Sequence, residues 1–139
     1  LLMWAAMHVV KAAISQHAGR HTDRVGRRPL ILAGWMVYAI TLFALAFVKQ
    51  PHMLWAWSLA LGFYFGLTEG AERALVRDLA APAERGTAFG WFHMLVGLAA
   101  IPAGLLLGGL WAFYGVKLAF LVSATFAAVA CAGFWRYVR

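Results

Sequence analysis

The residues best suited to chemistry in this sequence are charged side chains that interrupt long apolar stretches. Glu69, Glu72 and Arg73 lie within about one helical turn of one another, and Lys11 interrupts an earlier apolar run. At helical spacing the first three project within about 100° of one another, so they share one face. At a rise of about 1.5 Å per residue, Lys11 reaches a depth similar to that of both glutamates. We therefore expect Lys11 to pair with one of the two acids.

Two interpretations of these charges stay open at this point. Charged groups inside a membrane usually pair with one another, so the cluster could serve only to tie two helices together. Alternatively, Glu69 or Glu72 could take up a proton in one conformation, because removal from water raises the cost of its charged form.

Histidine gives weaker evidence for chemistry. His17 and His21 are four residues apart, a spacing that can place two imidazoles on one metal ion, and Ser15 lies nearby. A third ligand is missing from this stretch, and the remaining histidines are scattered. We therefore expect no metal site, no cofactor and no enzymatic activity.

The composition indicates an integral membrane protein. Hydrophobic residues make up 64% of the chain and charged residues 12%, and the mean hydropathy is +0.77. Soluble domains are roughly 45–50% apolar and 25% charged. The net charge of +7 would suggest nucleic acid in a soluble protein, but the basic residues are spread between apolar runs. The expected partner is the lipid bilayer, with no role for nucleic acid.

The apolar runs predict an all-α membrane protein in which one unit, 1–139, contains five transmembrane helices. The expected spans are 1–18, 29–48, 53–79, 83–114 and 117–137. The chain opens inside an apolar run, so we expect it to be a piece of a longer protein. The only cysteine, Cys131, is expected to be an inert thiol facing lipid.

The basic residues of the connecting segments predict the orientation of the spans. One side collects eight arginines, whereas the other has only Lys49 and Lys117. The eight are Arg20, Arg24, Arg27, Arg28, Arg77, Arg85, Arg136 and Arg139. Because short cytoplasmic loops retain lysine and arginine, this side and the C-terminus are predicted to be cytoplasmic. The expected location is the cell membrane, with the chain crossing it several times.

Polar and small residues distinguish the spans from one another. The second and fifth spans carry few polar groups and are expected to face lipid. Glycines recur at four-residue spacing in the third span, at Gly62, Gly66 and Gly70, and the fourth span is also rich in glycine. Small residues let helices approach closely, so both spans are predicted to pack tightly against neighbours.

The segment between the first two spans carries a specific motif. Gly19, Asp23, Arg24, Gly26, Arg27 and Arg28 occupy fixed positions in the sequence GRHTDRVGRRP. Glycine permits close helix approach or a tight turn, and an acid can interact with a helix N-terminus or a guanidinium group. A loop that was merely basic would explain the arginines but not two glycines at this spacing.

The motif resembles the cytoplasmic signature of the major facilitator superfamily (MFS), with every fixed position matched. The stretch from Asp78 to Gly90, which includes Arg85, resembles the next cytoplasmic loop of the family. The resemblance implies a permease, a secondary active transporter that moves a small solute by alternating access. Lys11, Glu69, Glu72 and Arg73 would then be candidates for the transport pathway, where an acid could couple solute movement to a proton gradient. The resemblance also implies a partly buried network of Asp23, Arg27 and Asp78 at the cytoplasmic end, with Arg85 beside it.

Family members have about twelve helices in two similar halves, and each half carries this loop. First halves usually have an arginine signature early in the helix that matches the third span, and 59–66 has no arginine. We therefore expect this chain to be helices eight to twelve, the C-terminal half, with an N-terminal half missing. The alternatives are a small stand-alone dimeric transporter of the multidrug type and a membrane scaffold that transports nothing.

Overall fold

The computed structural model describes residues 1–138, and for residues 20–25 it describes the backbone only. Within that part the chain is helical, without strands, as the all-α prediction requires. The helices are α1 (Leu2–Val25), α2 (Arg27–Leu45), α3 (Met53–Leu79), α4 (Arg85–Tyr114) and α5 (Val116–Tyr137), with a short 3₁₀ helix, η1 (Pro82–Glu84), before α4.

The junction between α1 and α2 differs from the prediction. A basic loop was expected after residue 18, but α1 continues to Val25 and only Gly26 separates it from α2. Gly26 has a φ of 86°, in the region that favours glycine, so this one residue is enough to reverse the chain. Gly115, also with a φ of 86°, makes the turn between α4 and α5 in the same way.

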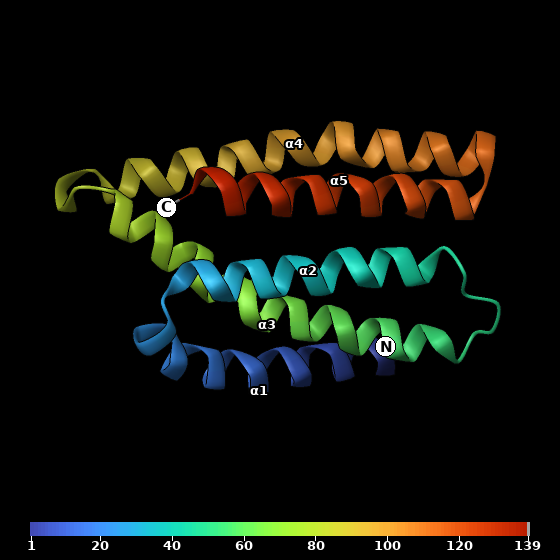
Figure 1. Ribbon diagram of the computed structural model, residues 1–139, viewed down its shortest axis with the longest axis horizontal. Helices are drawn as coiled ribbons and strands as arrows, with labels where there is room; N and C mark the ends of the chain where they lie inside the picture. Colours follow the sequence, from blue (N-terminus) through green and yellow to red (C-terminus); the bar gives the residue numbers. More distant parts are fainter. Residues whose placement is uncertain (139) are drawn as a thin grey trace.

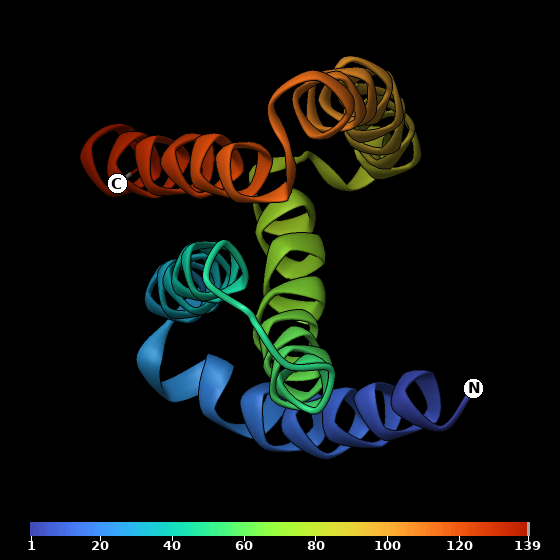
Figure 2. The same ribbon diagram turned by 90° about the vertical axis from the view of Figure 1, so that its right-hand side faces the viewer.

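The five helices run up and down beside one another (Figure 1). The α1–α2 and α3–α4 connections lie at one end together with the C-terminus, and the α2–α3 and α4–α5 connections lie at the other. Along the bundle, α3 lies in the middle, with α1 on one side and α4 and α5 on the other (Figure 2). The most extensive contacts join α1 to α3, followed by α2 to α3 and α2 to α5.

Close packing between α3 and its neighbours depends on glycine. A Cβ added at Gly62 would lie 2.5 Å from the carbonyl oxygen of Met7, and one at Gly66 would lie 2.6 Å from Cβ of Ile14. Gly34 of α2 allows the same approach against Thr68, which is 2% exposed. Gly70 has open space around it, so the predicted stripe is used at two of its three positions.

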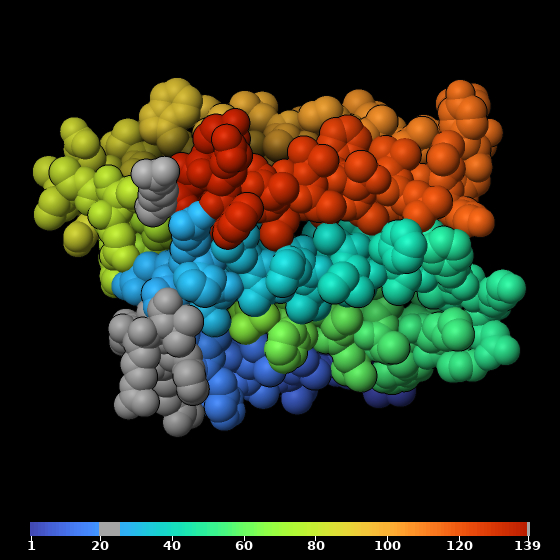
Figure 3. Space-filling view, viewed as in Figure 1, coloured from blue at the N-terminus to red at the C-terminus, as the bar shows by residue number. Residues whose placement is uncertain are grey.

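The second span was expected to face lipid, but one side of α2 is buried against other helices. This helix packs between α3 and α5, and α2 and α5 lie side by side on the face shown in Figure 3. Leu42 and Leu45 form a small core with Ala124 of α5. Met36 and Ile40 point away from it and are exposed, as expected for a lipid-facing side.

The predicted tight packing of α4 is not seen. The structure has no buried residue in this helix, and no α4 glycine would bring an added Cβ within 4 Å of another described atom. α4 contacts mainly α5 and, less extensively, α3. Most of its surface is therefore uncovered by the described residues.

Three of the helices are long and apolar enough to cross a membrane: Arg27–Leu45, Pro82–Tyr114 and Val116–Tyr137. The other two, α1 and α3, carry the charges that lower their hydropathy, and they make the most extensive helix contact of the chain. Such charges are tolerated in membranes where they face protein or water. Of the five predicted crossings, three therefore correspond to helices that are long and apolar enough to span a membrane, and those of α1 and α3 stay predictions.

Candidate functional site

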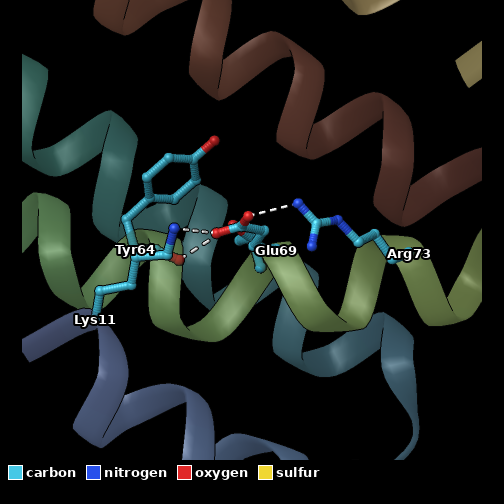
Figure 4. A network of polar contacts seen from close by, with 5 residues as sticks. Lys11, Tyr64, Glu69 and Arg73 are labelled. Atoms are coloured by element: carbon cyan, nitrogen blue, oxygen red, sulfur yellow. Dashed lines mark hydrogen bonds and ion pairs between the residues drawn. The ribbon is translucent and has the colours of Figure 1, made fainter. Parts of the chain in front are cut away.

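An ion cluster joins α1 to α3 (Figure 4). Lys11 of α1 forms an ion pair with Glu69, and Nη2 of Arg73 lies 2.6 Å from Oε1 of the same carboxylate. Of the two acids predicted as partners of Lys11, the structure therefore pairs it with Glu69. The side chains of Lys11 and Glu69 are about one third exposed, at 32% and 34%. Two cations share one carboxylate, so the cluster has a net positive charge.

The packing of α1 on α3 sets the position of this cluster. A Cβ at Gly66 would lie 3.0 Å from the carbonyl oxygen of Lys11, so the backbone of α1 rests on α3 at this point. Glu69 lies three residues further along α3, on the same side of the helix. The lysine ammonium also lies 5.6 Å from the ring centroid of Phe65, a favourable cation–π distance.

Glu72 has a different partner. The indole Nε1 of Trp35 in α2 donates a hydrogen bond of 2.9 Å to Oε1 of Glu72. The shared face expected for the two glutamates and Arg73 therefore divides: Glu69 turns to α1, whereas Glu72 turns to α2. The side chain of Glu72 is half-buried.

A groove of about 820 Å³ opens along these charges. Its polar floor comes from α3 and its walls come from the first part of α1 and from α4. The lining residues are Leu1, Met3, Trp4, Met7, His8 and Lys11; Trp57, Ser58, Leu61, Tyr64, Phe65, Thr68, Glu69, Glu72 and Arg73; and Phe92, His93 and Val96. A volume of this size is enough for a small organic molecule.

A second pocket of about 460 Å³ lies between α2, α3, α4 and α5. Aromatic rings and aliphatic side chains form most of its wall, and Glu72 is its one charged residue. The lining residues are Ile31, Trp35, Tyr38, Tyr64, Glu72, Leu75, Val76, Phe92, Val96, Ala127, Ala130 and Phe134. Tyr64, Glu72, Phe92 and Val96 line both spaces.

The arginine-rich end of the bundle contains part of the expected network. Nε of Arg27 lies 2.6 Å from Oδ2 of Asp78, and Nη2 of Arg77 lies 3.3 Å from Oδ1. The contact expected between Arg27 and Asp78 is therefore present. Arg28 donates a hydrogen bond to the carbonyl oxygen of Trp135, near the end of α5. These contacts connect α2 to α3 and to α5 at the same end.

Other predicted residues of this end are not placed in the network by the described contacts. Arg85 begins α4 and is exposed, and the described ion pairs of Asp78 are with Arg27 and Arg77, so the place of Arg85 in this network stays a prediction. The side chains of Asp23 and Arg24 lie outside the described residues. The exposed Gly19 belongs to α1, and Gly26 makes the turn described above.

The histidines do not assemble a site in the described part of the chain. Nδ1 of His17 lies 2.7 Å from the carbonyl oxygen of Ala13, and Nδ1 of His8 lies 2.9 Å from that of Trp4, both within α1. The side chain of His21 is outside the described residues. Among the described residues there is no group of three or more His, Cys, Asp or Glu side chains placed to hold a metal ion.

Sequence reasoning did not find Trp35 or the second pocket. Trp35 lies within an apolar run, and its role depends on which face of α2 meets α3. The available signal was the indole N–H itself, because a buried tryptophan usually finds an acceptor. Cys131, expected to face lipid, instead lies partly buried between α5 and α2, with Sγ 3.9 Å from the carbonyl oxygen of Leu32.

A helical bundle with paired charges beside a groove, and with helices apolar enough to span a bilayer, has the features of a membrane transport protein. The comparisons with known proteins narrow this class. The sequence model of the Major Facilitator Superfamily matches residues 2–139, and the chain therefore belongs to that family of transporters. As a member with apolar helices, it is a membrane protein.

Several characterised and uncharacterised transporters are similar to the chain. It is 31% identical over 112 residues to an uncharacterized MFS-type transporter of Methanocaldococcus jannaschii, covering 80% of this chain and 28% of that protein. It is 31% identical to the multidrug resistance protein MdtH of Cronobacter sakazakii over 96% of this chain and 35% of that protein. It is 30% identical to the proton-coupled antiporter flippase LtaA of Staphylococcus aureus over 70% of this chain and 26% of that protein.

The chain spans about a third or less of the length of these curated relatives. No solved structure matches it significantly.

Proposed function

We propose that this chain forms helices eight to twelve of a secondary transporter that moves a small solute by alternating access, driven by protons. The groove between α1, α3 and α4 is its contribution to the solute pathway, and the missing first half of the protein supplies the facing wall. The observation that carries this proposal is the Lys11–Glu69–Arg73 cluster in the floor of a groove of about 820 Å³. The arginine-rich end, with the C-terminus, is proposed to be cytoplasmic.

Three features support the assignment of the groove. Its floor carries charges that need protein or water around them, and its walls carry aromatic rings that suit an organic solute. α4, which forms one wall, is largely uncovered by the described residues, as a helix facing another half would be. Relatives of the chain are named for multidrug resistance and for proton-coupled antiport, which are activities of this kind.

Coupling to protons is assigned to Glu69 and Glu72 together. Glu69 is paired with two cations in this arrangement, whereas Glu72 has one hydrogen bond and no ion pair with a described residue. Movement of α1 relative to α3 would separate Lys11 from Glu69 and so change the proton affinity of that carboxylate. A groove that opens and closes can thereby be linked to proton uptake.

The test is uptake by the intact protein that carries this chain, reconstituted in liposomes with an imposed pH gradient. Glu69→Gln and Glu72→Gln should each leave the protein folded and inserted while removing or altering the dependence of transport on pH. Glu84→Gln, an identical change at the exposed η1 segment, serves as the matched control and should leave transport unchanged. Full activity with unchanged pH dependence in both groove variants would leave only a structural role for the cluster.

A further inference from the structure

We propose that the second pocket, between α2, α3, α4 and α5, binds an organic monocation, with Glu72 as the counter-charge and a cage of aromatic rings around the cation. The pocket shares Tyr64, Glu72, Phe92 and Val96 with the groove, but the Lys11–Glu69–Arg73 cluster lines only the groove. This proposal rests on the proposed function in one respect: it takes the bound cation to be a member of the class of solutes that the protein transports.

Aromatic side chains surround the proposed site in two pairs. The rings of Tyr38 and Tyr64 stack with their centroids 4.7 Å apart and an interplanar angle of 23°. Those of Trp35 and Phe134 approach to 5.1 Å at 50°. Phe92 of α4 adds a fifth ring to the lining. Ring faces attract organic cations, and cages of aromatic residues are a common way to recognise a quaternary ammonium group.

The charge of the pocket has one sign. Glu72 is the only charged residue among the described residues of its lining, and the indole of Trp35 donates to Oε1, which fixes the orientation of the carboxylate. Oε2 has no hydrogen bond to another described residue. An ionised carboxylate beside apolar rings is costly unless a positive charge compensates it. A cation supplies this compensation, whereas an anion would be repelled.

The groove differs in this respect, because it also contains Lys11 and Arg73, and both of these cations pair with Glu69. Ligand size adds a second distinction. A volume of about 460 Å³ is within the usual range for small-molecule sites. A bare metal ion would need several oxygen ligands, and this pocket offers one carboxylate among rings. The geometry therefore favours a bulky, hydrophobic cation over an inorganic one.

The experiment compares two probes of nearly the same shape and opposite charge, tetraphenylphosphonium and tetraphenylborate. Binding is measured by equilibrium dialysis with the intact protein in lipid nanodiscs, and empty nanodiscs are subtracted. We expect saturable binding of the phosphonium cation that Glu72→Gln weakens by about tenfold or more, since the pocket loses its only charge. Trp35→Phe, which retains a ring but removes the N–H donor, should weaken binding by a smaller factor, about threefold.

Controls separate this pocket from the groove and from nonspecific partition. Glu84→Gln should bind the cation as the unmodified protein does. Folding of each variant is checked by its elution profile and thermal unfolding, and Phe134→Leu tests the cage if Glu72→Gln does not fold, with an expected loss of about threefold or more. Equal saturable binding of the borate anion, or loss of cation binding in Glu69→Gln but not in Glu72→Gln, would overturn the proposal. A protein that binds the cation but transports nothing would contradict the proposed function alone.

Discussion

Both α3 and α4 contain several glycines, but among the described residues only α3 has glycines that a neighbouring helix contacts closely. α1 fills the space that a side chain of α3 would need, with the carbonyl group of Met7 at Gly62 and the side chain of Ile14 at Gly66. At Gly104 and Gly108 of α4, a Cβ would meet nothing within 4 Å among the described residues. A stripe of small residues therefore predicts that a helix can be approached closely, but it does not identify the helix that approaches.

The same two regions differ in charge. α3 holds Glu69, Glu72 and Arg73, and each has a partner on α1, α2 or α3 itself. α4 instead presents large apolar side chains, including Trp91, Leu95 and Leu105, each more than half exposed. Polar groups are expensive in lipid and apolar ones are not. The charged helix is accordingly the one that its neighbours cover, and the apolar helix is the one left uncovered.

The largest effect is expected when a methyl group is added to a glycine in each of the two regions, α3 and α4. Gly66→Ala should destabilise the protein by about 1–3 kcal/mol, because the new Cβ would lie 2.6 Å from Cβ of Ile14 and force α1 away from α3. Gly104→Ala should be neutral or slightly stabilising, since it adds helix propensity of up to about 1 kcal/mol without a clash. Thermal unfolding of the purified protein in detergent measures both. Equal destabilisation by the two variants would show that α4 is as closely packed as α3.

A smaller effect is expected from the ion pair between α1 and α3. Lys11→Met and Glu69→Gln should each destabilise the protein, and the double variant should be less destabilised than the sum of the two, with a coupling of about 0.5–1 kcal/mol. The value is modest because both side chains are about one third exposed. Arg73→Gln is the comparison within one helix, where an i, i+4 pair contributes about 0.3–0.5 kcal/mol. If the effects of the Lys11 and Glu69 variants on the free energy of unfolding simply add, the ion pair does not stabilise the contact between α1 and α3.

Much of this architecture could be predicted from the sequence, because apolar runs and their interruptions depend on local composition. The range 53–79 agrees with α3 from Met53 to Leu79, and the turn at Gly115 falls between the expected spans 83–114 and 117–137. The end of α1 was predicted too early, because the arginines after residue 18 suggested a loop. These arginines are compatible with a helix, and the helix ends only at Gly26, whose φ of 86° is not helical.

The contacts of the site were less predictable than the helices. The pairing of Lys11 with Glu69 was one of two options, because depth along a helix does not specify rotation about its axis. The bond from Trp35 to Glu72 depends on the face that α2 turns to α3, which the uniform apolar run around Trp35 does not reveal. The described ion pairs of Asp78 are with Arg27 and Arg77, and the place of Arg85, at the start of α4, stays a prediction.

The smallest effect concerns a contact that holds the α4–α5 turn against the rest of the bundle. Lys117 Nζ lies 5.1 Å from the ring centroid of Phe47, just beyond the end of α2. Both side chains are exposed, so the cation–π contact contributes about 0.5–1 kcal/mol at most. Lys117→Met should therefore leave global unfolding almost unchanged while amide hydrogen exchange near Gly115 becomes faster, because this turn has few other ties. Lys49→Met, at the same end but outside this contact, is the matched control. Faster exchange in both variants would indicate a general effect of charge. No change in either would mean that the contacts of α5 with α2 and α4 hold the turn without the cation–π contact.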